Sequence, residues 1–320
     1  MFNIDIKIKS VDDLLRCVNL SSLLELSGWP KPGNVHRTKN FVDTRFEHFL
    51  AGITAIQPNF RELCEIIYSS IENDMLDFTK IKLGLFYKKS VKEMIKWQSG
   101  GNVLLGHILI LAPLVCAATI CLKTNKVKIE EFELTLRRVI DDATVEDTLN
   151  LYDAIKICNP GGLGRIEKYD IYGENTYNEI KQDNITLKKI FELSKDYDLI
   201  SGEYSTGFNI ILREGLPYFI ETFKTAQDIN IAVVNTYLKL LSNNLDTLII
   251  RKSGKKVALE VSKMAFDILI QGGISTKKGL ELTIEFDKYL HKQNGKLNPG
   301  TTADLLAGVI FCALIFGLKY

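Results

Sequence analysis

The sequence lacks an excess of charge of either sign. Its 320 residues contain 40 Lys plus Arg against 39 Asp plus Glu, which gives a net charge of +1. Such a balanced chain creates no global field that would attract nucleic acid or an anionic membrane. We therefore expect neither as a partner, and any phosphate binding must come from a local cluster of residues.

The sequence also lacks the cysteine patterns of a zinc site or a disulfide framework. Its six cysteines are scattered, without a CxxC pair and without histidines at zinc-finger spacing, which favours buried free thiols in a reducing compartment. The first ten residues alternate apolar and charged side chains and have no apolar core of a signal peptide. We expect a cytoplasmic protein, and the pattern leaves a homo-oligomer open.

Long uncharged runs are rare, with one exception. Residues 103–122 carry no formal charge, and a run of this length is enough to cross a membrane as a helix. His107, Pro113 and the lack of a second comparable run argue against a membrane span. We expect a helix that is buried on all sides at the centre of a large helical protein.

Helical periodicity dominates the rest of the chain. Only residues 1–10 and 247–251 carry a strand-like signal, and no change of composition divides the chain. The sequence therefore predicts an all-α fold with one domain over residues 1–320, in which the polar region 165–184 is a candidate lid. The predicted helices cover residues 11–27, 44–56, 59–71, 91–97, 129–140, 144–158, 185–195, 216–228, 231–241, 257–271 and 280–293, and a last helix follows the turn at 297–302.

Two loops rich in proline and glycine carry groups suited to phosphates. The loop 29–37 (WPKPGNVHR) follows Glu25, and its glycine lets the backbone bend sharply or approach a ligand closely. The turn 297–302 (LNPGTT) feeds into an apolar helix, where free backbone N–H groups form an anion site. Asp304 follows in the first turn, as a helix-stabilising residue, a general base or a Mg²⁺ ligand.

Three further segments carry polar groups, and each also fits the residues that ordinarily begin or end a helix. In residues 244–254, Asp246 precedes the basic pair Arg251 and Lys252. Such a segment is found where a salt bridge closes the end of a helix or strand, and also where charged side chains hold a substrate. A Gly-Gly-Asn turn at 100–102 opens the uncharged run, and acidic residues flank the breaker-rich loop 159–164.

Common catalytic patterns are missing. The sequence has no GxxxxGK[ST], GxGxxG, HExxH or GxSxG run, and its four histidines are so widely separated that we expect no His-based triad. A site made of carboxylates and cations remains, which suits phosphate and sugar chemistry with Mg²⁺.

Five segments, taken together and in their order along the chain, form a specific pattern. They are ELSGWPKPGNVHR (25–37), SGGNVLLGHI (99–108), PGGLG (160–164), LDTLIIRKSG (245–254) and LNPGTTADLL (297–306). In this order, over nearly the whole chain, the sequence resembles the triphosphoribosyl-dephospho-coenzyme A synthase family. The resemblance implies an all-helical transferase that joins ATP to 3′-dephospho-coenzyme A and releases adenine, to make the prosthetic-group precursor of citrate lyase or malonate decarboxylase.

The chain departs from the family pattern at two places. Members of the citrate lyase type carry Thr-His-Lys-Gly where this chain has Val-Leu-Leu-Gly at 103–106, and Arg-Gly-Glu where it has Leu-Gly-Arg at 163–165. It therefore resembles a divergent branch, similar to members in archaea and in C1-metabolising bacteria. Two alternatives stay open: a phospho- or ribosyltransferase acting on another coenzyme precursor, such as one of the methanopterin pathway, and a nucleotide-binding protein without activity.

The reaction class assigns roles to the candidate residues. Loss of adenine from C1′ of ribose builds positive charge on the sugar, so one carboxylate stabilises this charge and a second accepts the proton of the attacking hydroxyl. We expect Asp246 and Asp304 to be these two. The expected ligands of ATP are Lys31, Gly33, Asn34, Arg37, Asn102, Arg251, Lys252, Asn298, Gly300, Thr301 and Thr302, and the expected ligands of Mg²⁺ are Glu25, Asp147 and Asp170.

Overall fold

The structure is a computed structural model that describes residues 5–161 and 164–320. Within these ranges the chain forms helices, and the only β-structure is isolated bridges. The α-helices are α1 (Val11–Ser27), α2 (Phe46–Ser70), α3 (Leu83–Lys96), α4 (Leu105–Lys123), α5 (Ile129–Asp141), α6 (Val145–Cys158), α7 (Thr176–Gln182), α8 (Leu187–Ser194), α9 (Leu199–Thr206), α10 (Leu216–Ala226), α11 (Ile229–Asn243), α12 (Thr247–Ser253), α13 (Lys255–Ile270), α14 (Lys277–His291) and α15 (Gly300–Ile315). Two 3-10 turns, η1 (Phe78–Lys80) and η3 (Gly273–Ser275), and a π-helix, η2 (Ile210–Gly215), complete the set.

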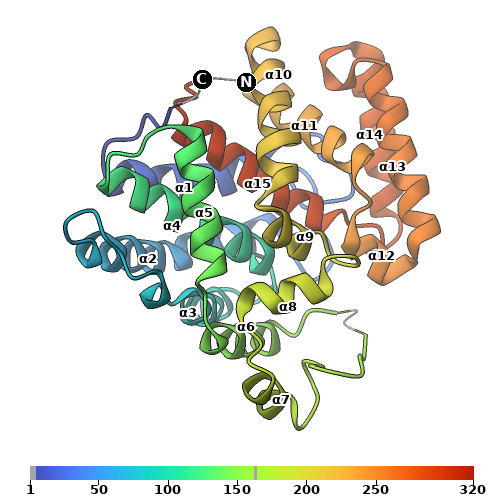
Figure 1. The fold of residues 1–320 in the computed structure, drawn as a ribbon. Helices are drawn as coiled ribbons and strands as arrows, with labels where there is room; N and C mark the ends of the chain where they lie inside the picture. Colours follow the sequence, from blue (N-terminus) through green and yellow to red (C-terminus); the bar gives the residue numbers. More distant parts are fainter. Residues whose placement is uncertain (1–4, 162–163) are drawn as a thin grey trace.

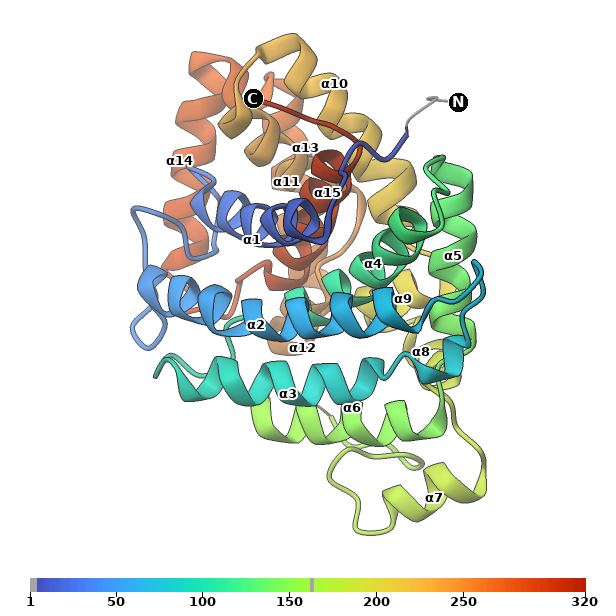
Figure 2. The same ribbon diagram turned by 90° about the vertical axis from the view of Figure 1, so that its left-hand side faces the viewer.

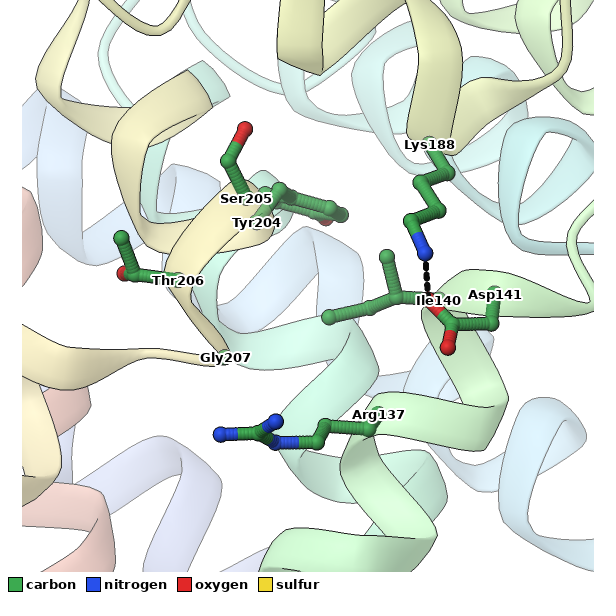
Figure 3. Close-up of a pocket in the computed structure, with 8 residues that line it drawn as sticks. All are labelled: Arg137, Ile140, Asp141, Lys188, Tyr204, Ser205, Thr206 and Gly207. Carbon is green, nitrogen blue, oxygen red and sulfur yellow. Dashed lines mark ion pairs between the residues drawn. The ribbon is translucent and has the colours of Figure 1, made fainter.

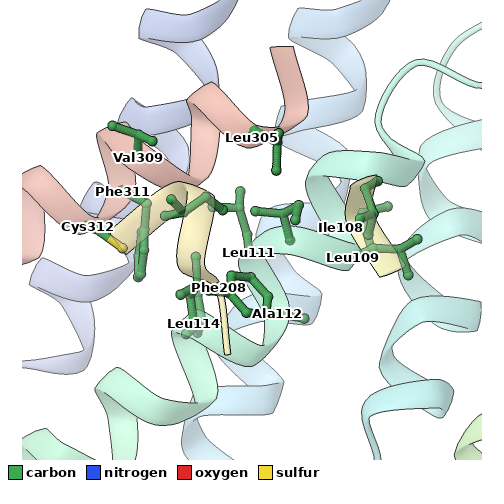
Figure 4. Close-up of a cluster of buried hydrophobic side chains, with 14 of the residues drawn as sticks. Ile108, Leu109, Leu111, Ala112, Leu114, Phe208, Leu305, Val309, Phe311 and Cys312 are labelled. Carbon is green, nitrogen blue, oxygen red and sulfur yellow. The ribbon is translucent and has the colours of Figure 1, made fainter. Parts of the chain in front are cut away.

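Two apolar helices form the centre of the molecule. α4 packs along α15, and Figure 4 shows side chains of both helices meeting around Phe208. On one side α1, α2, α3 and α6 follow one another as successive layers, and α10 to α14 gather on the other side (Figures 1 and 2). The buried apolar side chains join in one continuous cluster.

The expected central helix is present. α4 is long and apolar enough to cross a membrane, but 89% of its most apolar 18-residue window is buried inside the protein. It is apolar around its whole circumference because neighbouring helices cover every face. The predictions of an all-α fold and of a buried apolar helix are confirmed.

Local structure differs from the predictions at several points. The two helices expected around Pro58 form one helix, α2, with the proline inside it. The strand-like run 247–251 is helix α12, because Asp246 caps its N-terminus through the N–H groups of Leu248 and Ile249. Part of the polar region 165–184 forms helix α7.

Of the strand expected over residues 1–10, the described part, residues 5–10, forms a single bridge. Asp5 pairs with Lys128 in antiparallel sense, and residues 1–4 lie outside the described residues. The same holds for Gly162 and Leu163, so the PGGLG segment is described only in part.

Candidate active site

Four charged side chains that are far apart in the sequence meet inside the protein. Glu25 lies near the end of α1, Lys31 in the following loop, His107 in the first turn of α4 and Asp304 in the first turns of α15. The Lys31 ammonium forms an ion pair with the Glu25 carboxylate and also donates to its backbone oxygen at 2.9 Å. His107 Nε2 lies 3.3 Å from Glu25 Oε2, and His107 Nδ1 lies 2.8 Å from Asp304 Oδ1. We call this row the charged relay.

Only the last member of the charged relay reaches the surface. The side chains of Lys31, Glu25 and His107 are at most 3% exposed, whereas that of Asp304 is 20% exposed. The relay therefore runs from the interior to one accessible carboxylate.

The relay members shift one another's pKa values. Burial by itself disfavours the charged form of His107, but the hydrogen bond to Asp304 and the carboxylate of Glu25 beside the ring outweigh it and raise the pKa to about 9. Burial also opposes ionisation of Glu25, yet Lys31 and His107 hold its pKa below the usual value. Burial raises the pKa of Asp304, and the negative charge of Glu25 adds to this rise while His107 opposes it. His107 is thus a cation between two carboxylates at neutral pH.

The site lies where the two central helices begin. A side chain on Gly106 would collide with the Asp304 carboxylate, so the absence of a Cβ there lets α15 bring Asp304 against α4. Because each helix N-terminus carries partial positive charge, both dipoles favour an anionic substrate near Asp304.

The two predicted phosphate loops contact each other beside the relay. Asn34 Nδ2 donates to Asn298 Oδ1 at 3.0 Å, which joins the loop 29–37 to the turn that starts α15. Gly33 has a left-handed φ of 72°, and its N–H donates to Asp287 Oδ1 at 3.0 Å. A side chain there would meet Leu290, so this position requires glycine.

Sequence reasoning missed a second histidine cluster at this loop. Asp287 Oδ1 lies 2.9 Å from His291 Nδ1, and Asp287 Oδ2 lies 3.4 Å from His36 Nε2. The pKa of Asp287 stays low although burial opposes ionisation, because both imidazoles hydrogen-bond to it. The spacing of the histidines in the sequence gave no sign of this cluster, because it forms only when folding brings the loop 29–37 against α14.

Asp246 is placed differently from Asp304. It is fully buried, and besides capping α12 its Oδ2 accepts from Thr302 N at 2.7 Å and from Thr302 Oγ1 at 2.9 Å. Burial raises its pKa to about 6 against these hydrogen bonds. With four donors directed at it, Asp246 ties α12 to the start of α15.

The expected cations separate into one buried and three accessible side chains. Lys31 has no exposed surface and holds Glu25, so it does not reach a phosphate at the surface. Arg37 is exposed and donates to Asn230 Oδ1 at 2.9 Å. Arg251 pairs with Asp198 at 3.1 Å, and Lys252 donates to Gly295 O at 3.1 Å.

The remaining expected ATP ligands line the starts of α4 and α15. Asn102 is exposed, and its Oδ1 accepts from Leu105 N at 3.1 Å. Thr301 Oγ1 lies 3.2 Å from Thr247 Oγ1, and Gly300 packs against Leu248. These residues fix the helix starts that surround Asp304.

The three expected Mg²⁺ ligands do not come together. Glu25 belongs to the charged relay, and Asp147 accepts from the N-cap of α6, Thr144 N, at 2.8 Å and from Gly84 N at 2.9 Å. In Figure 2 the layers of α2 and α3 separate α6 from α1. Asp170 accepts backbone N–H groups in the exposed loop after α6. Among the residues that the structure describes, no group of three or more His, Cys, Asp or Glu suits a metal ion.

Two hollows lie elsewhere on the protein. Figure 3 shows a pocket of about 90 Å³ between α5, α8 and the end of α9, where Lys188 pairs with Asp141 and Arg137 lies below Gly207. A groove of about 650 Å³ runs between α2 and α3. Neither contains a member of the charged relay.

Comparison with known proteins points to one family. The model of the CitG family, ATP:dephospho-CoA triphosphoribosyl transferase, matches residues 11–319. A relative from Photobacterium profundum, assigned as a 2-(5″-triphosphoribosyl)-3′-dephosphocoenzyme-A synthase, is 27% identical over 293 residues, which cover 89% of this chain and 82% of that protein. A relative from Citrobacter koseri with the same assignment is 31% identical over 142 residues, 44% of this chain and 46% of that protein, so this match spans less than half of the relative.

A solved structure shows the same fold. A protein from Archaeoglobus fulgidus, described as a candidate triphosphoribosyl-dephospho-CoA synthase, matches with a TM-score of 0.61 and 25% identity. The match covers 84% of this chain and all of that one.

Proposed function

Because the chain belongs to the ATP:dephospho-CoA triphosphoribosyl transferase family, we propose that it transfers the triphosphoribosyl group of ATP to 3′-dephospho-coenzyme A or a closely related acceptor, with release of adenine. One observation carries this proposal beyond the family match. It is the charged relay, whose accessible carboxylate, Asp304, lies between two helix N-termini that favour an anionic substrate.

The reaction requires a carboxylate at the sugar. The bond between C1′ of the ATP ribose and N9 of adenine breaks, and a bond between C1′ and the acceptor oxygen forms. Positive charge develops on the ribose during this exchange, and Asp304 stabilises it. Asp304 then takes the proton of the acceptor hydroxyl and releases it to solvent, and the departing adenine takes up one proton from solvent, so that Asp304 returns to its carboxylate form and atoms and charge balance.

The rest of the relay positions Asp304. His107 donates to it and stays cationic, while Glu25 and Lys31 balance the charge of the imidazolium in the interior. A buried charge of this kind is tolerated only when it is paired. We assign Asp246 a supporting role as well, since it fixes the start of α15 from which Asp304 projects.

Within residues 5–161 and 164–320, no cluster of carboxylates is placed to bind Mg²⁺. Since Glu25, Asp147 and Asp170 are separated, they do not fit a shared metal site. We propose that Mg²⁺ enters as the counterion of the ATP phosphates. Activity is then expected to follow the concentration of the Mg·ATP complex and to disappear with excess EDTA.

The proposed compartment is the cytoplasm, where ATP and coenzyme precursors are available. All six cysteines are unpaired and five of them are buried, which suits a reducing compartment.

The test is a product analysis with and without acceptor. The protein is incubated with Mg²⁺ and ATP, with or without 3′-dephospho-coenzyme A, and adenine, ADP and the coupled product are followed by mass-resolved chromatography. Acceptor-dependent adenine together with a triphosphoribosyl adduct supports the proposal. ADP instead of adenine points to a phosphotransferase, and ATP binding without turnover points to another acceptor or to a binding protein.

Two variants make this test specific to the site. Asp304→Asn keeps the size of the side chain but removes the base, so we expect adenine release to fall about 100-fold or more. Asp183→Asn, at an exposed carboxylate paired with Lys168, serves as the matched control and should retain wild-type activity. Full activity of the Asp304→Asn protein would remove Asp304 from the mechanism.

A further inference from the structure

Asp198 connects three helices near the charged relay. It is the N-cap of α9, where its Oδ2 accepts from Ser201 N at 2.9 Å and from Ser201 Oγ at 2.8 Å. This leaves its other carboxylate oxygen for partners outside α9.

That second oxygen faces α12. Asp198 Oδ1 accepts from Arg251 Nη1 at 3.1 Å and from Thr247 Oγ1 at 3.5 Å. Thr247 Oγ1 lies 3.2 Å from Thr301 Oγ1, at the start of α15. Asp198 is therefore linked to the helix that carries Asp304, through two threonine hydroxyls.

The Asp198–Arg251 pair is accessible. The side chains of Asp198 and Arg251 are 20% and 28% exposed, whereas Asp246, the other cap in this region, is fully buried. Within the described ranges Asp198 is the only ion-pair partner of Arg251. A guanidinium has five N–H donors in a fixed planar fork, so one carboxylate partner leaves donors for an incoming anion.

Two cations lie side by side at this position. Lys252 follows Arg251 on the same short helix, and its pKa is lowered by burial and by the neighbouring guanidinium, while the Asp246 carboxylate opposes this shift. Asp246 accepts from four donors of α12 and α15, so Asp198 is the carboxylate that contacts Arg251 directly.

We propose that Asp198 is a positioning residue that holds the Arg251 guanidinium beside the Asp304 site, where it binds the polyphosphate chain of the nucleotide substrate. The inference rests on the proposed function and adds a residue that the sequence motifs did not indicate. A bidentate contact between a guanidinium and phosphate is among the strong charge-assisted hydrogen bonds, so its orientation matters.

Asp198 has a second, measurable effect on the site. Burial is the main reason for the raised pKa of Asp304, and the negative charges of Glu25 and Asp198 add to it. Removing the charge of Asp198 should therefore shift the acidic limb of the kcat/KM profile to lower pH. This shift reports the charge of Asp198 near Asp304, whereas the affinity for polyphosphate reports how Asp198 orients Arg251.

The experiment measures binding separately from turnover. Tripolyphosphate, ATP and adenosine are titrated by calorimetry into the full chain of the wild type, Asp198→Asn and Arg251→Gln. Asparagine is a good N-cap, so Asp198→Asn is expected to keep α9 folded, which circular dichroism checks. Arg138→Gln, at an exposed arginine paired with Asp142, is the control.

We expect both site variants to bind tripolyphosphate and ATP about tenfold more weakly or worse, and to bind adenosine with unchanged affinity. In turnover, both variants should raise KM for ATP more than they lower kcat. Wild-type affinity of Asp198→Asn for tripolyphosphate, or an equal loss for adenosine, would overturn the inference. If the wild type bound neither ATP nor tripolyphosphate, the proposed function itself would fail.

Discussion

His107 makes the stability of the protein fall between pH 6.5 and 9. The pKa of His107 rises from its ordinary 6.5 to about 9 on folding, because Asp304 and Glu25 hold its proton. The contribution of His107 to the free energy of unfolding is therefore complete below pH 6.5 and is lost as pH rises towards 9. We expect the wild-type free energy of unfolding to fall across this window by on the order of 3 kcal/mol.

Urea unfolding at pH 6, 7, 8 and 9 measures this dependence. His107→Gln should be destabilised at pH 6 and should lack most of the fall between pH 7 and 9. The buried Glu203 has a pKa raised to about 7. Its contribution to the free energy of unfolding is therefore largely lost below pH 7, before the range from pH 7 to 9 in which His107 is tested. Parallel pH profiles for the variant and the wild type would assign the fall to other groups.

Gly106 is the second residue on which the site depends. In Gly106→Ala the new methyl group would occupy the place of the Asp304 carboxylate, so this side chain must move. We expect adenine release to fall about 100-fold, since misplacing a catalytic group by about 1 Å has effects of this size. ATP affinity, measured by calorimetry, should change less than turnover, because the Arg251 guanidinium proposed to bind the polyphosphate lies on α12. Normal turnover would show that Asp304 tolerates displacement.

At the scale of elements, the contact between α3 and α6 depends on a missing side chain. A Cβ on Gly84 would overlap the backbone of Asp147, and no flexible side chain is there to move away. Gly84→Ala should therefore lower the free energy of unfolding by about 2 kcal/mol or more.

Gly202 is the matched control for Gly84. It lies inside α9, and the nearest atom to an added methyl group would be Lys195 O at an ordinary 3.7 Å. Gly202→Ala should be neutral or stabilise the protein by up to about 1 kcal/mol through helix propensity. Chemical denaturation compares the two, and equal effects would refute the packing argument.

The sequence predicted most helices because their apolar periodicity is local information. It failed where tertiary contacts override it. The β-branched run after Asp246 is strand-like by composition, but the cap and its contact with Thr302 make it a helix. Pro58 indicated a break, yet α2 continues through it between the flanking layers.

The site was predictable only in part for the same reason. Breaker-rich loops identified residues around Asn34 and Asn298, which the fold brings into contact. The role of His107 was not predictable, since pairing with Glu25 and Asp304 depends on how α1, α4 and α15 pack. A lone histidine in an uncharged run was the one available signal.

For the whole molecule, the central position of α4 and α15 predicts a gradient of local stability. Amide hydrogens of these two helices should exchange only through global unfolding, because neighbouring helices cover them on every side. Amides of residues 164–175, an exposed segment without helix, should exchange fastest. Hydrogen exchange followed by mass spectrometry resolves the segments, and early exchange in α15 would contradict the gradient.

The burial of Lys31 also determines which reagents can reach it. An amine-acylating compound needs an accessible amine, and the folded protein does not offer one at this position, since the Lys31 side chain is enclosed with Glu25. Acylation of Lys31 therefore reports opening of the protein around α1. A ligand that binds at Asp304 and slows this opening would slow the labelling, which makes Lys31 a chemical probe for finding the natural acceptor.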